Sequence, residues 1–237
     1  ARNLSITLLE DAPTREEWSK ADIEREVRVV VSVEGRDQLI GVEQVQERGG
    51  NAFRIRKEAE VLHRNANEEL ITDLQGEGAR SRMVGVALGT KSQRFDHHTR
   101  HRHLAGRTWS DIDFKSVGAD KSRSSYTGLI RIEEGARVSE AYQVNRNLLL
   151  SDRSRADAIP ELEILNEEVS CSHGATVAPV DRDQLFYLES RGLDPDAALR
   201  LVVRGFLEKT LQSIPEALRD GIEELVEGRL ANLREGS

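Results

Sequence analysis

Cys171 and His173 have the residue types and the spacing of a soft-metal site. They stand two positions apart in the segment Cys-Ser-His-Gly-Ala-Thr, and residues i and i+2 of an extended strand project from the same face. A thiolate and an imidazole placed side by side suit iron or zinc. The alternative is that Cys171 is an inert cysteine that packs in a core.

A second group of candidate ligands lies in residues 96–103, which contain four of the six histidines of the chain. His101 and His103 would share one face of a strand and could chelate a metal ion together. Such a site would fit a metal-dependent enzyme built on a β-helix or a β-barrel. The alternative is a solvent-exposed strand or sheet edge whose polar side chains lie in water.

Other common chemistries find little support in the sequence. It contains neither a Gly-x-x-x-x-Gly-Lys-Ser/Thr phosphate loop nor a Gly-x-Ser-x-Gly nucleophile elbow, so nucleotide hydrolysis would need a partner protein. A β-helix enzyme acting on polysaccharide would need sugar-stacking aromatic residues, and the chain has only two Trp, three Tyr and five Phe. One cysteine also cannot supply the full set of thiolate ligands that an iron–sulfur cluster requires.

The elements that must position these residues are mostly short strands. β-branched or alternating segments are separated by glycine-containing turns, and they are Glu26–Val33, Phe53–Val61, Tyr126–Ile132, Val138–Leu150 and Glu161–Val177. Residues 58–70 are ambiguous between strand and helix. Short strands at this rhythm fit a sandwich, a barrel or a β-helix, and the periodicity does not choose among them.

The pattern becomes helical near residue 181. A capping box or a proline at the first helical position marks three helix starts, at Asp181, Asp194-Pro195 and Pro215. Gly192 is a natural stop for the first helix. The sequence therefore predicts a mainly β body over residues 1–180 and a helical domain over residues 181–237.

The composition narrows the possible partners and location. The chain has 237 residues, 38% of them hydrophobic, and a net charge of -8, whereas nucleic-acid binders normally carry a basic excess. No apolar run approaches the roughly 18 residues that a membrane span needs, and the N-terminus does not have the pattern of a signal peptide. A single cysteine excludes an internal disulfide and favours a reducing, cytoplasmic setting.

Eight short segments occur in the order found in one known family. They are Leu74–Ala79, Asp96–Thr99 with His103, Ser124–Gly128, Asn147–Ser151, Pro160–Ile164, Cys171–Thr176, Gln184–Leu193 and Val203–Phe206. Each segment is weak by itself, but together they are specific. Over residues 74–230 the chain resembles the C-terminal two-thirds of the SufB/SufD family of iron–sulfur cluster assembly scaffolds.

This resemblance implies a fold, partners and a cargo. Members of the family fold as a right-handed parallel β-helix followed by C-terminal helices. They pair as SufB–SufD heterodimers or as homodimers, and the helical tail docks an ABC-type ATPase, SufC. The resemblance thus implies a non-catalytic scaffold that binds an iron–sulfur cluster transiently near the interface between its two subunits.

The motifs favour the SufD branch. The Cys-Ser-His-Gly-Ala-Thr form is the SufD pattern, and Asn145 stands where SufB proteins carry a cysteine, although residues 124–128 lean towards SufB. By the resemblance, His173 matches a histidine that SufD contributes at the dimer interface, and Cys171 matches the adjacent cysteine. If two chains met around a two-fold axis near residue 171, two thiols and two imidazoles would converge. The partner, a SufB-type subunit or a second copy, is left open.

Overall fold

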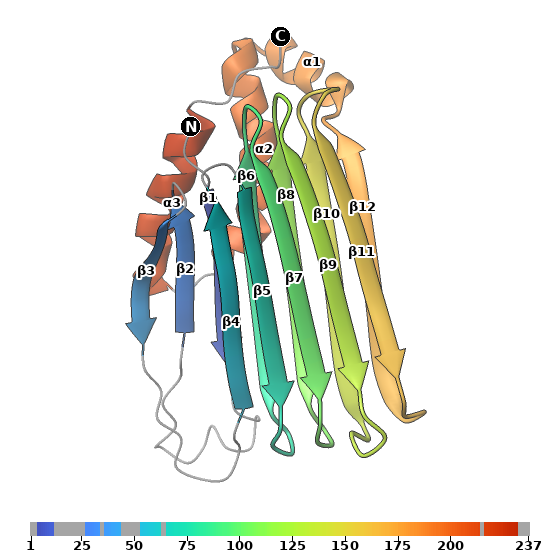
Figure 1. Cartoon of the computed structure of the whole chain (residues 1–237). Helices are drawn as coiled ribbons and strands as arrows, with labels where there is room; N and C mark the ends of the chain where they lie inside the picture. Colours follow the sequence, from blue (N-terminus) through green and yellow to red (C-terminus); the bar gives the residue numbers. More distant parts are fainter. Residues whose placement is uncertain are drawn as a thin grey trace.

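The computed structural model describes the backbone of residues 4–11, 27–33, 36–43, 53–62, 65–213 and 216–231, and the side chains of residues 70–213, 220, 223–224 and 226–231. Its centre is a stack of strands flanked on one side by helices (Figure 1). The strands form two sheets, ordered β12-β10-β8-β6-β1-β2-β3 and β11-β9-β7-β5-β4.

Eight consecutive strands build a parallel β-solenoid of about four turns. They are β5 (Asn65–Leu74), β6 (Arg80–Gly89), β7 (Arg94–His103), β8 (Trp109–Gly118), β9 (Arg123–Ile132), β10 (Ser139–Leu149), β11 (Arg155–Ile164) and β12 (Val169–Pro179). The chain alternates between the two sheets, and each strand pairs in parallel with the strand one turn later. The spacing of the strands left a sandwich, a barrel and a β-helix open. The β-helix, which the family resemblance implies, is therefore confirmed.

Four further strands precede the solenoid. They are β1 (Leu4–Asp11), β2 (Val27–Val33), β3 (Arg36–Glu43) and β4 (Phe53–Leu62), and all of them pair antiparallel. The described residues of the ambiguous run, 58–62 and 65–70, belong to β4 and β5, so its helical alternative is wrong for them. The single segment predicted for Glu161–Val177 is also wrong, because it contains the end of β11, a corner and most of β12.

Alternate residues of each strand fill the space between the two sheets. This interior contains aliphatic side chains such as Met83 and Ile112, and also the ring of Phe114. A Cβ at Gly85 would lie 2.0 Å from a ring carbon of Phe114. Gly85 is therefore required by the close approach of this ring, since any side chain there would displace it.

Three helices follow the last strand: α1 (Arg182–Ser190), α2 (Pro195–Gln212) and α3 (Glu216–Leu230). The predicted helix starts at Asp181 and Asp194 and the stop at Gly192 are confirmed, whereas the start predicted at Pro215 lies outside the described residues. Asp181 accepts hydrogen bonds from the backbone N–H groups of Asp183 and Gln184, and Gly192 has φ +97°. The change from strand to helix falls between Pro179 and Arg182, whereas the division into two domains stays a prediction.

Helix α2 packs on the outer face of the sheet that contains β6 and β8. Leu199, Val203 and Leu207 of α2 join a buried cluster with aliphatic residues of these strands. Two hydrogen bonds join α2 to β8. Lys115 Nζ donates to the carbonyl of Phe206 at 2.6 Å, and the Thr210 hydroxyl donates to an Asp113 carboxylate oxygen at 3.0 Å. None of the helices described is long and apolar enough to cross a membrane.

Candidate functional site at the end of the solenoid

Cys171 and His173 lie on β12, an end strand of its sheet and part of the last turn of the solenoid. In the β10–β12 register, Ala141 is opposite Cys171 and Gln143 is opposite His173. Ala141 and Gln143 are fully buried between the sheets, and residues paired in register share a face. The predicted pair therefore occupies one face of one strand, and that face continues the solenoid interior.

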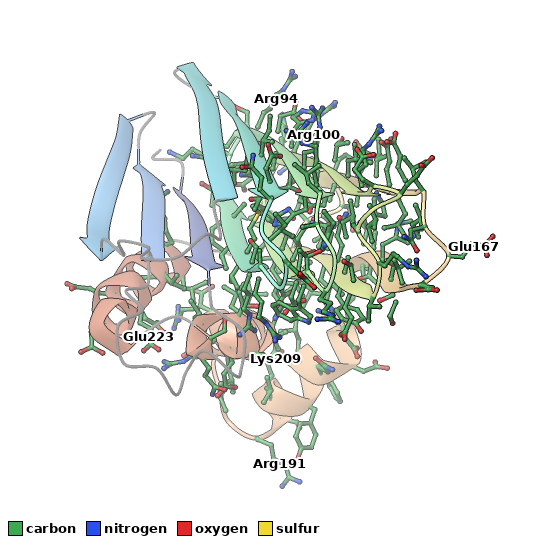
Figure 2. The ribbon with its side chains drawn as sticks, turned by 90° about the horizontal axis from the view of Figure 1, so that it is seen from below. Arg94, Arg100, Glu167, Arg191, Lys209 and Glu223 are labelled. Atoms are coloured by element: carbon green, nitrogen blue, oxygen red, sulfur yellow. The ribbon has the colours of Figure 1, made fainter. Side chains whose placement is uncertain are left out.

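The end position leaves this face open to solvent. His173 is exposed and Cys171 is half-buried, because no further turn of the described chain covers β12 as β12 covers β10. Figure 2 labels Glu167, in the corner between β11 and β12, at the end of the solenoid farthest from β3. The thiol and the imidazole are thus interior-facing residues that solvent or a second protein can reach.

The Cys171 thiol is not activated in this chain. Its sulfur packs beside the buried cluster that includes Ile130 and Ala141. Burial raises the pKa of the Cys171 thiol above its ordinary value, and a hydrogen bond with the backbone of Ala141 only partly opposes that shift. The thiol is therefore protonated near neutral pH, and a metal ion would have to displace its proton.

Two buried amide side chains lie on β10, Gln143 opposite His173 and Asn145 opposite Ala175. Gln143 donates through Nε2 to the Gly128 carbonyl at 3.1 Å, while its Oε1 has no hydrogen-bond partner among the residues described. Asn145 is also fully buried, and its Nδ2 likewise has no partner there. Sequence reasoning missed both as site residues. The available signal was the run of amides at every second position of β10, on the same face as Ala141.

His101 and His103 do share one face of β7, but that face is the solenoid interior. Both are completely buried, so the alternative of a solvent-exposed strand is wrong for these two residues. His103 bonds through Nδ1 to the Thr108 hydroxyl at 2.7 Å and through Nε2 to the Ser110 hydroxyl at 2.9 Å. Nε2 of His101 lies 3.4 Å from the Ser81 hydroxyl, and its Nδ1 has no hydrogen-bond partner among the residues described.

Burial also fixes the charge state of these histidines. Desolvation, together with the neighbouring His103, lowers the pKa of His101 to about 3, and desolvation lowers the pKa of His103 to about 4. Both imidazoles are neutral near pH 7. The ring nitrogens of His103 are occupied by hydroxyl groups, and no group of three potential ligands for a metal ion occurs among the described residues. His101 and His103 are thus buried, neutral residues of the solenoid core, and their use as a pair of metal ligands stays a prediction.

Comparison with known proteins identifies the family of this chain. The family described as "SUF system FeS cluster assembly, SufBD core domain" matches residues 31–206. Relatives include SufD of Escherichia coli, 34% identical over 171 residues, which cover 72% of this chain and 38% of that protein. SufB of Bacillus subtilis is 35% identical over 142 residues, covering 60% and 30%.

An iron–sulfur cluster assembly SufBD family protein of Mycobacterium leprae is 37% identical over 154 residues, covering 65% of this chain and 18% of that protein. The chain thus spans less than two-fifths of the length of these relatives. Because they include both SufB and SufD, the SufD-like assignment stays a prediction. The matched core domain covers well over half of the chain, and the chain therefore belongs to the SufBD family of the SUF system for iron–sulfur cluster assembly.

Proposed function

We propose that this chain is a non-catalytic scaffold subunit in which Cys171 and His173 bind an iron–sulfur cluster transiently at a subunit interface. One observation carries the proposal: the two side chains continue the interior face of the solenoid but lie on its last, uncovered turn. The cluster is the cargo of the scaffold. A thiol and an imidazole are two ligands, so the remaining ligands come from a second subunit.

The exposed end of the solenoid has the properties of an association surface. β11 and β12 are end strands of the two described sheets, and unpaired strand edges pair readily with another chain. Apolar side chains on this last turn are unusually exposed, among them Ile159, Leu165 and Val177. Pairing with a SufB- or SufD-type subunit, or with a second copy, would bury them and bring the ligands of both subunits together.

Anaerobic reconstitution with iron and sulfide tests the cluster site. The chain would be used together with a SufB-type subunit, and separately at a concentration that favours self-association. Bound iron and sulfide should fall by at least about half for Cys171→Ala and for His173→Ala, since each change removes one ligand. The control is His98→Ala, which removes a half-buried histidine on β7 that pairs with Asp96 at 3.1 Å. Equal loading of all four proteins would exclude Cys171 and His173 as ligands.

The helical tail provides the second part of the proposed function, the docking of a SufC-like ATPase. A groove of about 460 Å³ lies between α1 and α2, lined by Asp181, Asp183, Gln184, Tyr187, Leu188, Leu201 and Val202. Phe186, Tyr187 and Leu201 are large apolar residues that are 72%, 56% and 48% exposed. Aromatic and aliphatic anchors beside a groove are typical of the centre of a protein interface.

Co-purification with the ATPase tests this docking site. Leu201→Asp places a charge in the groove and should weaken ATPase binding by roughly tenfold or more. Glu208→Ala alters an exposed residue of the same helix that does not line the groove, and its binding should match that of the unmodified chain. Undiminished ATPase binding by Leu201→Asp would exclude the groove as the docking site.

A further inference from the structure

The outer face of the β5–β7–β9–β11 sheet carries two rows of arginine that differ in their partners. In the first row, Arg102 bonds to Asp73 with Nε 2.6 Å from Oδ1. Arg131 in the same row bonds to Glu133 at 2.7 Å and to Glu163 at 3.0 Å. Every arginine of this row is therefore neutralised by a carboxylate of its own chain.

The second row consists of Arg94, Arg123 and Arg155, which we name the arginine row. The three residues are in register on β7, β9 and β11. Neighbouring strands lie about 4.8 Å apart, so the three Cα atoms span roughly 10 Å. All three side chains are exposed. No carboxylate of the described residues forms an ion pair with any of them; Arg155 bonds only to the backbone carbonyls of Asp152 and Ser154.

The arginine row stands on the face of the molecule that the helices leave uncovered. Figure 2 shows Arg94 projecting away from this sheet, on the side opposite the helices. The corner preceding each strand adds another cation, and these are Lys91, Lys121 and Arg153. The nearby carboxylates are fewer, and they are Asp96, Asp120, Asp152 and Asp157. Asp96 is engaged by His98, and Asp120 accepts a hydrogen bond from the Lys91 backbone N–H. A locally cationic surface thus sits on a chain of net charge -8.

We propose that the arginine row binds a linear oligophosphate group, such as a free triphosphate or the phosphate chain of a nucleotide. Like charges on directly neighbouring strands repel one another, and a multivalent anion removes that repulsion. Guanidinium groups bind phosphate through paired, charge-assisted hydrogen bonds. An extended acidic peptide presents carboxylates on one side only every second residue, roughly 6.7 Å apart. The directly linked phosphoryl groups of an oligophosphate supply more charge within the length of the row.

The oligophosphate site is independent of the cluster site. The arginine row is on the outer face of one sheet, whereas Cys171 and His173 belong to the interior-facing side of the other sheet. Loss of oligophosphate binding should therefore leave cluster binding unchanged, and the reverse also holds. The two proposals are tested by separate measurements.

Isothermal titration calorimetry, in which sodium tripolyphosphate is added to the full chain at low ionic strength, tests the proposal. We expect one saturable site, with tripolyphosphate bound at least roughly tenfold more tightly than orthophosphate because it contacts more than one arginine. Removing the central residue of the row by Arg123→Ala should weaken binding by roughly tenfold or more. Arg131→Ala is the matched control, since Arg131 lies on the same strand and the same face but is already paired. Its affinity should remain within about twofold of that of the unmodified chain.

Two further ligands define the chemical class. ATP bound as tightly as tripolyphosphate would show that the phosphate chain is the recognised group, and tighter binding of ATP would identify a nucleotide as its source. Poly-glutamate that binds where tripolyphosphate does not would overturn the proposal in favour of an acidic protein segment. The absence of saturable binding, or equal weakening by Arg123→Ala and Arg131→Ala, would also overturn it. Circular dichroism of each variant checks that the solenoid remains folded.

Discussion

Two pairs of residues with the same spacing have opposite environments in this solenoid. His101 and His103 stand two positions apart on β7, and Cys171 and His173 stand two positions apart on β12. Both pairs face the space between the sheets. The first pair is completely buried, whereas His173 is exposed. In a solenoid, therefore, the turns that follow a residue decide whether it belongs to the core or to a binding surface.

The chemical roles of the two pairs follow from this difference in solvent exposure. A turn on either side removes water from the histidines of β7, so their imidazoles are neutral and serve as hydrogen-bonding groups within the core. The last turn leaves its thiol and imidazole beside the buried amides of β10. Among the residues described, Oε1 of Gln143 and Nδ2 of Asn145 have no hydrogen-bond partner. Substitutions should consequently divide into those that change stability on β7 and those that change ligand binding on β12.

The largest expected effect is on stability, and it should separate the two pairs. His103→Ala removes a buried ring and leaves the Thr108 and Ser110 hydroxyls without that partner. We expect a loss of about 3 kcal/mol in the free energy of unfolding. Cys171→Ala removes one half-buried sulfur and should cost about 1 kcal/mol or less. Denaturant titration measures both values. Similar losses for the two variants would contradict the division between core and surface.

The next effect is a dependence of stability on pH. Burial depresses the pKa of His101 from 6.5 to about 3 in the folded chain, so below pH 6.5 the unfolded chain binds more protons than the folded chain. Stability is therefore full above pH 6.5 and falls as the pH is lowered towards 3. The part due to His101 is about 2 kcal/mol at pH 5. His101→Gln should reduce the difference in unfolding free energy between pH 7 and pH 5 by that amount. An unchanged difference would show that His101 is solvated.

Much of the fold follows from local signals, whereas the burial of individual residues does not. Asp181 and Gly192 mark the ends of α1 through interactions within one helical turn, which a sequence displays directly. The burial of His101 depends on strands β5 and β9, one turn away in each direction. The alternation of polar and apolar residues within β7 does not contain that information.

The candidate site shows the same limit. The same-face placement of Cys171 and His173 follows from their spacing, and their end position follows from the helical pattern that begins at residue 181. The run of amides on β10 marks Gln143 as a same-face polar residue, but its place opposite His173 follows only from the register of β10 with β12. The arginine row is a different case, because Arg94, Arg123 and Arg155 each follow a Gln or Ser at the start of a strand. Comparison of the chain with itself could have revealed that repeat.

The smallest expected effect concerns the reactivity of Cys171, and it sharpens the distinction between a metal ligand and a nucleophile. Because burial raises the pKa of this thiol above its ordinary value, the rate of alkylation by iodoacetamide should reach half its maximum at a higher pH in the folded chain than in the same chain in urea. At pH 8 the folded chain should react more slowly than the same chain in urea, since only the thiolate is nucleophilic. His173→Ala should leave this rate unchanged, because side chains two apart on one strand project in parallel rather than towards each other. A midpoint below that of the unfolded chain, moving upward in His173→Ala, would instead identify a thiolate–imidazole pair. Cys171 would then be a candidate nucleophile rather than a neutral thiol that becomes a metal ligand.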